Sequence, residues 1–189
     1  MEKPEYVWNV RIIRSRRKTV SIEVKPSEVI LRAPLYVTKS DIHEILKKKE
    51  GWITEHVKIV QARHEKAQKI PKFTAEEIKA LKRKANEIIP ERVAYYASQM
   101  GVDSEKISIR AQKTRWGSCS GKGNLNFNCL LVLFPNAIMD SIVVHELCHR
   151  KHMDHSPAFW TAVEDIFPNY RQAKAWLKEN GYALIGKIK

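Results

Sequence analysis

Val144-His145-Glu146-Leu147-Cys148-His149, followed by Arg150-Lys151-His152-Met153-Asp154-His155, is the stretch that decides the fold. It spells His-Glu-x-x-His, with a further histidine ten residues after the first. On a helix, His145 and His149 lie one turn apart on the same face, so both imidazoles point at one place. Glu146 lies about 100° further round the helix, within reach of a water held there. This spacing is typical of a zinc-binding helix in a metal-dependent hydrolase, with the glutamate as general base.

A catalytic zinc ion takes three protein ligands and keeps one position for water, so a third ligand has to be found. His152 stays on the same face if the helix continues past the motif. His155 reaches the metal only if the chain turns back, and Ser156-Pro157 favours such a corner, because serine caps helices and proline suits their first position. Glu164 of the second helix is another candidate. We rank His155 first, His152 second and Glu164 third, and expect the first helix to end near His152 or Met153.

The turn before the motif, Ile142-Val143-Val144, is apolar and predicts a buried helix. Four histidines fall within the eleven residues from His145 to His155. Buried polar groups without partners cost about 1–3 kcal/mol each. The context therefore favours a metal site over a chance motif on a surface helix.

The composition predicts a cytoplasmic protein without a membrane partner. The 189 residues are 43% hydrophobic, which is enough for a substantial core, and no apolar run is long enough for a membrane-spanning helix. The first residues, Met1 to Glu5, do not read as a signal peptide. The three cysteines, Cys119, Cys129 and Cys148, lack paired-ligand spacing and suggest a reducing compartment.

The chain is basic, with a formal net charge of +13. Residues 1–72 carry 17 Lys and Arg against 9 Asp and Glu, and residues 73–189 carry 17 against 12. A basic surface raises the expectation of an anionic partner, such as nucleic acid, a nucleotide or an acidic protein.

Residues 1–70 are predicted to form a β-meander followed by a helix. Strands are expected at 7–13, 19–25 and 28–32, paired antiparallel. The turn Arg14–Lys18 could contact phosphates or could be a solvated hairpin tip. A capping box at Thr38–Asp41 begins a helix that we expect to bend near Gly51 and to fade into a linker over 62–72.

Residues 71–189 are predicted to form the second domain and to give the whole chain an α+β fold. A capping box at Thr74 begins a long helix that Pro90 should kink or split and Gly101 should end. Strands at 106–112 and 124–133 follow, and a sheet edge there could add an extended peptide as a further strand. Trp116 and the asparagine row that includes Asn126 could line a cleft or could be ordinary core and surface residues.

The chain resembles the YgjP-like metal-dependent hydrolases, relatives of the SprT-like and minigluzincin zincins. The residues that carry the resemblance are, in order, Thr114–Ser120, Asn126, Leu130, Pro135, Val143–His149, His155-Ser156 and Phe159-Trp160. The resemblance implies a zincin-like core, made of a long helix, a small antiparallel sheet, the metal-binding helix and closing helices. It also implies that His145, His149 and His155 bind Zn²⁺ or another divalent metal, with Glu146 as base.

Three functions follow as hypotheses. The first is a zinc metallopeptidase acting on peptides or proteins, with Arg115, Trp116, Asn126 and His152 as substrate-binding candidates. His152, Arg115 and Tyr170 are the candidates for stabilising the oxyanion. The second is a metal-dependent nucleoside-triphosphate pyrophosphatase, although the sequence contains no glycine-rich phosphate loop. The third is a nucleic-acid-associated binding module or a DNA-linked protease, in which residues 1–72 contact phosphates.

Overall fold

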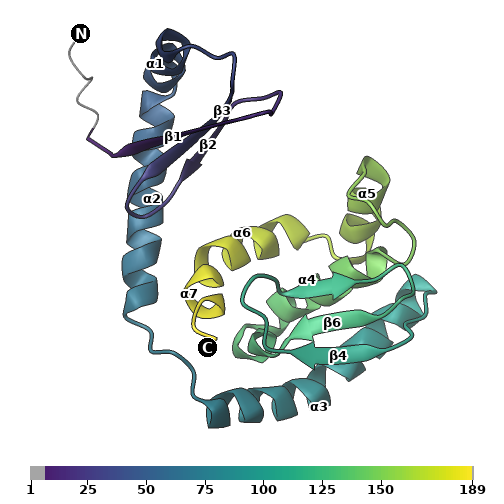
Figure 1. Ribbon diagram of the computed structural model, residues 1–189. Coiled ribbons are helices and arrows are strands. Elements are labelled where there is room, and N and C mark those ends of the chain that lie inside the picture. The colour runs from purple at the N-terminus through teal and green to yellow at the C-terminus, as the bar shows by residue number, and fades with distance from the viewer. Residues whose placement is uncertain (1–6, 189) are drawn as a thin grey trace. The chain divides into compact units, whose positions relative to one another are not determined.

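The computed structural model describes residues 7–188, which fall into two compact units, one up to Gln68 and the other from Lys69 onward (Figure 1). Each unit combines a three-stranded sheet with helices, so the predicted α+β class is confirmed. The N-terminal stretch examined for a signal peptide lies outside the described residues. Within residues 7–188, no helix has both the length and the apolar character needed to cross a bilayer.

The sheet of the first unit has the strand order β1-β3-β2, and its strands are β1 (Val10–Ser15), β2 (Ser21–Val24) and β3 (Val29–Pro34). β1 runs parallel to β3 and β2 runs antiparallel to it, so the predicted antiparallel meander was wrong. The reason lies in β3, where Val29, Ile30 and Leu31 are all fully buried. A strand that is apolar on both faces is most stable between two neighbours, whereas the charged β1 suits an edge.

Helices α1 (Lys39–Lys48) and α2 (Glu50–Gln68) cover one face of this sheet (Figure 1). The capping box is confirmed, since Thr38 accepts from the Asp41 amide and the Asp41 carboxylate accepts from the Thr38 amide. The helices are separated at Lys49, close to the bend expected at Gly51. The linker predicted over 62–72 began too early, because α2 remains helical to Gln68. Ile53 and Val57 anchor the first turns of α2 in the core.

The second unit begins with the long helix α3 (Ala75–Met100). Thr74 and Glu77 form the predicted capping box, and Gly101 ends the helix in the left-handed conformation with φ 60°. Pro90 lies inside α3 without dividing it. The buried neighbours Ile89 and Val93 pack into the core on both sides of the proline, and this packing outweighs the loss of one backbone donor.

The second sheet has the order β4-β6-β5 and is also mixed rather than antiparallel. Its strands are β4 (Ile107–Arg110), β5 (Gly117–Cys119) and β6 (Leu125–Asn128), with β4 parallel and β5 antiparallel to β6. The strand predicted to run to residue 133 stops at Asn128, and a 3₁₀ helix, η1 (Cys129–Leu133), follows. The cause is the buried Asn128 amide group, which donates to two carbonyls, of Gln112 and Arg115, and accepts from the Leu130 amide.

Helix α4 (Asn136–Cys148) carries the His-Glu-x-x-His motif and is buried along almost its whole length. A bidentate ion pair fixes it to α3, because Arg92 Nε and Nη2 lie 2.8 and 2.7 Å from the two carboxylate oxygens of Asp140. The Tyr96 hydroxyl lies 3.3 Å from the same carboxylate. Three further helices close the unit, α5 (Pro157–Ile166), α6 (Tyr170–Asn180) and α7 (Tyr182–Ile185).

Candidate metal centre

The motif helix ends earlier than the sequence predicted. α4 stops at Cys148 with His149 as its cap, not at His152 or Met153. The amides of Arg150 and Lys151 bond three residues back, to Leu147 and Cys148, which tightens the last turn. The side chains of the same two residues then hold the corner, since Arg150 Nε donates to the Asp103 carbonyl (2.8 Å) and Lys151 Nζ to the Met100 carbonyl (2.6 Å).

The second half of the corner forms as predicted. Ser156 is the N-cap of α5, with its side chain accepting from the Phe159 amide, and Pro157 is the first helical residue. The corner returns His155 to the two motif histidines. One ligand atom each from His145, His149 and His155 lies within 4.8 Å of the others, and the Nε2 atoms of His145 and His155 are 3.2 Å apart.

Two hydrogen bonds orient the rings. His149 Nδ1 donates to the backbone carbonyl of His152 (3.0 Å), so its Nε2 carries the free lone pair. The Tyr170 hydroxyl lies 2.9 Å from His145 Nδ1. Metal-binding histidines usually engage their second nitrogen with a carbonyl or another polar group in this way, which fixes the ring and its tautomer.

Burial favours the neutral form of the two motif histidines, His145 and His149. Burial, with neighbouring His149, His155 and Lys174, lowers the pKa of His145 to about 3. Burial is also the main cause of the lowered pKa of His149. Phe159 packs on all three rings, with centroid distances of 4.6 to 5.0 Å. Three imidazoles whose ring nitrogens come together in this way are a donor set that fits a divalent transition metal.

Glu146 is 6% exposed and lies against β5. Burial raises the pKa of its carboxyl group to about 7, while Arg115 and the backbone of Cys119 act in the opposite direction. The fit to β5 is close enough that a Cβ added at Gly117 would stand 2.5 Å from Glu146 Oε1. A carboxyl group with a pKa near neutrality can both take and release a proton.

The other residues that the sequence suggested as metal ligands or oxyanion donors make different contacts. His152 contributes its backbone carbonyl to the cluster rather than its ring, and Glu164 is paired with Arg171 (2.7 Å). Arg115 acts on the Glu146 carboxylate through its charge. Tyr170 engages a cluster histidine, which places its hydroxyl behind the rings.

The remaining two candidates lie in or beside the sheet. Trp116 packs edge-on against Phe134 in the hydrophobic core, with ring centroids 5.0 Å apart. The Asn126 side chain lies 3.4 Å from Ser118 Oγ of the neighbouring strand β5. Their roles in substrate binding stay predictions.

Sequence reasoning assigned no role to Gly117, and it considered Tyr170 for the oxyanion rather than as a partner of His145. Gly117 stands in the Trp-Gly-Ser run that carried the family resemblance, but a glycine in a loop has many explanations. Only the approach of a strand to Glu146 shows why a side chain is excluded there.

One family model matches most of the chain, and two solved structures are similar to about half of it. A family model described as YgjP-like, metallopeptidase domain, matches residues 18–80 and 71–180. The crystal structure of the metallopeptidase zymogen abylysin of Pyrococcus abyssi is similar over 51% of this chain and 99% of that chain, with 22% identity and a TM-score of 0.46.

The crystal structure of the metallopeptidase zymogen jannalysin of Methanocaldococcus jannaschii is similar over 48% of this chain and 93% of that chain, with 23% identity and a TM-score of 0.44. A search of curated proteins found no match. Since the family model spans most of the sequence, the chain belongs to the YgjP-like family of metallopeptidase domains.

Proposed function

We propose that this protein is a zinc-dependent peptidase in which His145, His149 and His155 bind the metal and Glu146 is the general base. The observation that carries the proposal is the combination of three converging histidines with a buried carboxylate on the same helix. The metallopeptidase family supports peptide-bond hydrolysis as the reaction.

The histidine cluster suits zinc because three imidazoles leave a fourth tetrahedral position for water. A zinc ion held by these residues would supply Lewis-acid polarisation of the peptide carbonyl and would lower the pKa of water to about 7. The hydrogen bonds from His149 to the His152 carbonyl and between His145 and Tyr170 keep the two rings ready before the ion arrives.

Glu146 takes the proton of the attacking water and returns it to the leaving amine. Its raised pKa, close to 7, matches this double task at neutral pH. The Cys119 backbone and the charge of Arg115 limit the rise of the pKa.

The substrate lies extended along β5 in this proposal. β5 is an edge strand, paired only with β6 within the sheet of the described residues, and Gly117 on it faces Glu146. A peptide added beside β5 would bring its backbone to the carboxylate through main-chain hydrogen bonds.

The decisive experiment compares the zinc-loaded wild type with Glu146→Gln on casein and on a broad peptide library. We expect cleavage by the wild type, loss of cleavage by a factor of about 10² or more in the variant, and equal zinc content in both. A parallel panel of nucleoside triphosphates, with and without Mg²⁺ or Mn²⁺, measures pyrophosphate release. If the wild type cleaves no peptide but releases pyrophosphate in a manner that depends on Glu146, the protein is a pyrophosphatase rather than a peptidase.

A further inference from the structure

The first unit contains a surface to which the proposed peptidase mechanism assigns no role. Because β1 and β2 flank β3, the segment that joins them passes over the end of β3 (Figure 1). There it meets the residues that follow β3. The Arg14 guanidinium donates to the carbonyls of Leu35 (3.2 Å) and Val37, and the Tyr36 hydroxyl donates to the Lys18 carbonyl (3.4 Å). We call residues 14–18 and 35–37 together the basic loop surface.

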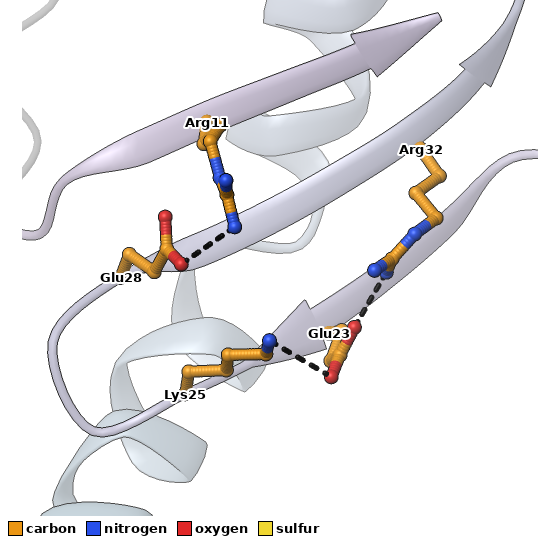
Figure 2. A network of polar contacts seen from close by, with 5 residues as sticks. All are labelled: Arg11, Glu23, Lys25, Glu28 and Arg32. Atoms are coloured by element: carbon orange, nitrogen blue, oxygen red, sulfur yellow. Dashed lines mark hydrogen bonds and ion pairs between the residues drawn. The ribbon is translucent and has the colours of Figure 1, made fainter. Parts of the chain in front are cut away.

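The positive charges of the same sheet are neutralised elsewhere. On its open face Arg11 pairs with Glu28 (2.9 Å), and Glu23 lies between Arg32 and Lys25, as Figure 2 shows. On this face three cations share two carboxylates, so each of the three positive charges has an acidic partner.

The basic loop surface has no such balance. The sequence has no acidic residue between Glu5 and Glu23. Within residues 7–188, no ion pair involves Arg16, Arg17 or Lys18, of which the first and last are exposed. Arg17 Nε is buried with no hydrogen-bond partner, although a buried donor without a partner costs about 1–3 kcal/mol. An anionic ligand would balance the charge of these side chains.

An aromatic ring stands beside these charges. Tyr36 is 76% exposed and Leu35 is 60% exposed, although both follow directly after a buried strand. The hydrogen bond from the Tyr36 hydroxyl to Lys18 holds the ring next to the cations. A fixed ring of this kind offers a flat apolar face to a ligand.

We propose that the basic loop surface binds single-stranded nucleic acid, with phosphates on Arg16, Arg17 and Lys18 and an unpaired base on Tyr36. Guanidinium groups suit phosphate oxygens because their donors are planar and paired. Stacking of a base on an aromatic ring contributes about 1–3 kcal/mol and requires a base outside a duplex. A duplex, an anionic membrane or an acidic peptide would use the charges but would leave the ring without a stacking partner.

The first test measures fluorescence anisotropy of labelled oligouridine and oligothymidine of about 20 nucleotides with the full chain, over a range of salt concentrations. We expect micromolar binding that weakens with salt, with a log–log slope of about −0.7 for each phosphate contact. The double variant Arg16→Gln/Lys18→Gln should bind about tenfold more weakly and lose about 1.4 units of slope.

A matched control removes the same charge from the same unit. Lys47 and Lys48 are exposed on α1, so Lys47→Gln/Lys48→Gln should bind within about twofold of the wild type. A second pair tests stacking, since Tyr36→Ser should lose about tenfold in affinity while Tyr36→Phe, which keeps the ring but not its hydrogen bond to Lys18, should lose much less. Circular dichroism checks that each variant remains folded.

Four results would overturn the proposal. They are no binding up to about 100 μM protein, equal losses in the loop and control pairs, no effect of Tyr36→Ser, and preference for a duplex of the same length. Vesicles with anionic lipid and polyglutamate serve as competitors. If either binds in a manner lost on Arg16→Gln/Lys18→Gln while oligonucleotides do not bind, the partner is of that class instead.

Discussion

Gly117 and Glu146 are in direct contact, with no space for a side chain between strand β5 and the carboxylate of the motif helix. A Cβ at residue 117 would stand 2.5 Å from Oε1 and 2.7 Å from Cγ of Glu146. Contact with Cγ as well as the carboxylate means that the glutamate has to rotate away or the strand has to move. The position of Glu146, the proposed base, therefore depends on the position of β5, the strand beside which the substrate is proposed to lie.

Gly117→Ala should therefore displace Glu146 and reduce peptide cleavage by about 10²-fold or more, with zinc affinity unchanged. Gly121→Ala is the matched control, because nothing lies within 4 Å of a Cβ there. The measurements are kcat/KM on a cleaved peptide and zinc content after dialysis. Full activity of Gly117→Ala would show that Glu146 does not need its present position.

Tyr170→Phe should weaken metal binding. The change removes the hydroxyl that lies 2.9 Å from His145 Nδ1 and keeps the aromatic ring beside it. Losing such an orienting partner lowers metal affinity by about 10–100-fold. Competition for zinc against a chromophoric chelator measures the effect. Tyr95→Phe, at an exposed position on α3, is the control, and equal zinc affinities for the two variants would contradict an orienting role for Tyr170.

The sequence was most informative where the signal is local. Spacing alone placed two histidines and Glu146 on one helix, and the Ser156-Pro157 pair predicted the corner that brings His155 back. The two capping boxes were also confirmed, because each depends on side chains three residues apart.

The errors concern contacts between distant residues. Strand alternation predicts that a strand exists but not which neighbour it pairs with, so the parallel pairing of β1 with β3 was missed. The early end of α4 depends on carbonyls of Asp103 and Met100, which accept from Arg150 and Lys151 nearly fifty residues later. The proximity of Gly117 to Glu146 is likewise a long-range packing fact.

Glu146→Gln should stabilise the protein after its metal has been removed with a chelator, with an effect that grows as the pH rises from 4.5 to about 7. The folded-state pKa of Glu146, about 7, lies above the ordinary value of 4.5 for a glutamate. Its contribution is therefore fully favourable below pH 4.5, and is lost as pH rises through 7, where the buried carboxylate ionises. At pH 8 the loss is up to about 3 kcal/mol, since one pKa unit corresponds to about 1.4 kcal/mol.

Thermal unfolding of chelated wild type and Glu146→Gln at pH 4.5, 6 and 8 checks this expectation. The Tm of the variant should exceed that of the wild type at pH 8, and the difference should shrink toward pH 4.5. The low pKa of His145 destabilises both proteins equally in acid, so it cancels from the comparison. A difference in Tm that does not change with pH would mean that ionisation of Glu146 is not its cause.

Asp140→Ala should destabilise the fold because it removes the ion pair between α3 and the motif helix α4. Asp140 is 6% exposed and accepts two hydrogen bonds from Arg92 and one from Tyr96. Removing it leaves Arg92, itself partly exposed, without its partner, and we expect a loss of about 2–4 kcal/mol in urea unfolding.

Arg92→Ala should cost at least as much, because it leaves the carboxylate buried without its cation. The double variant should then lose less than the sum of the two single losses, which is the signature of a direct interaction. Additive losses would show that the two residues stabilise the fold independently. The ion pair would then not be what holds α4, and with it the three histidines, in place against α3.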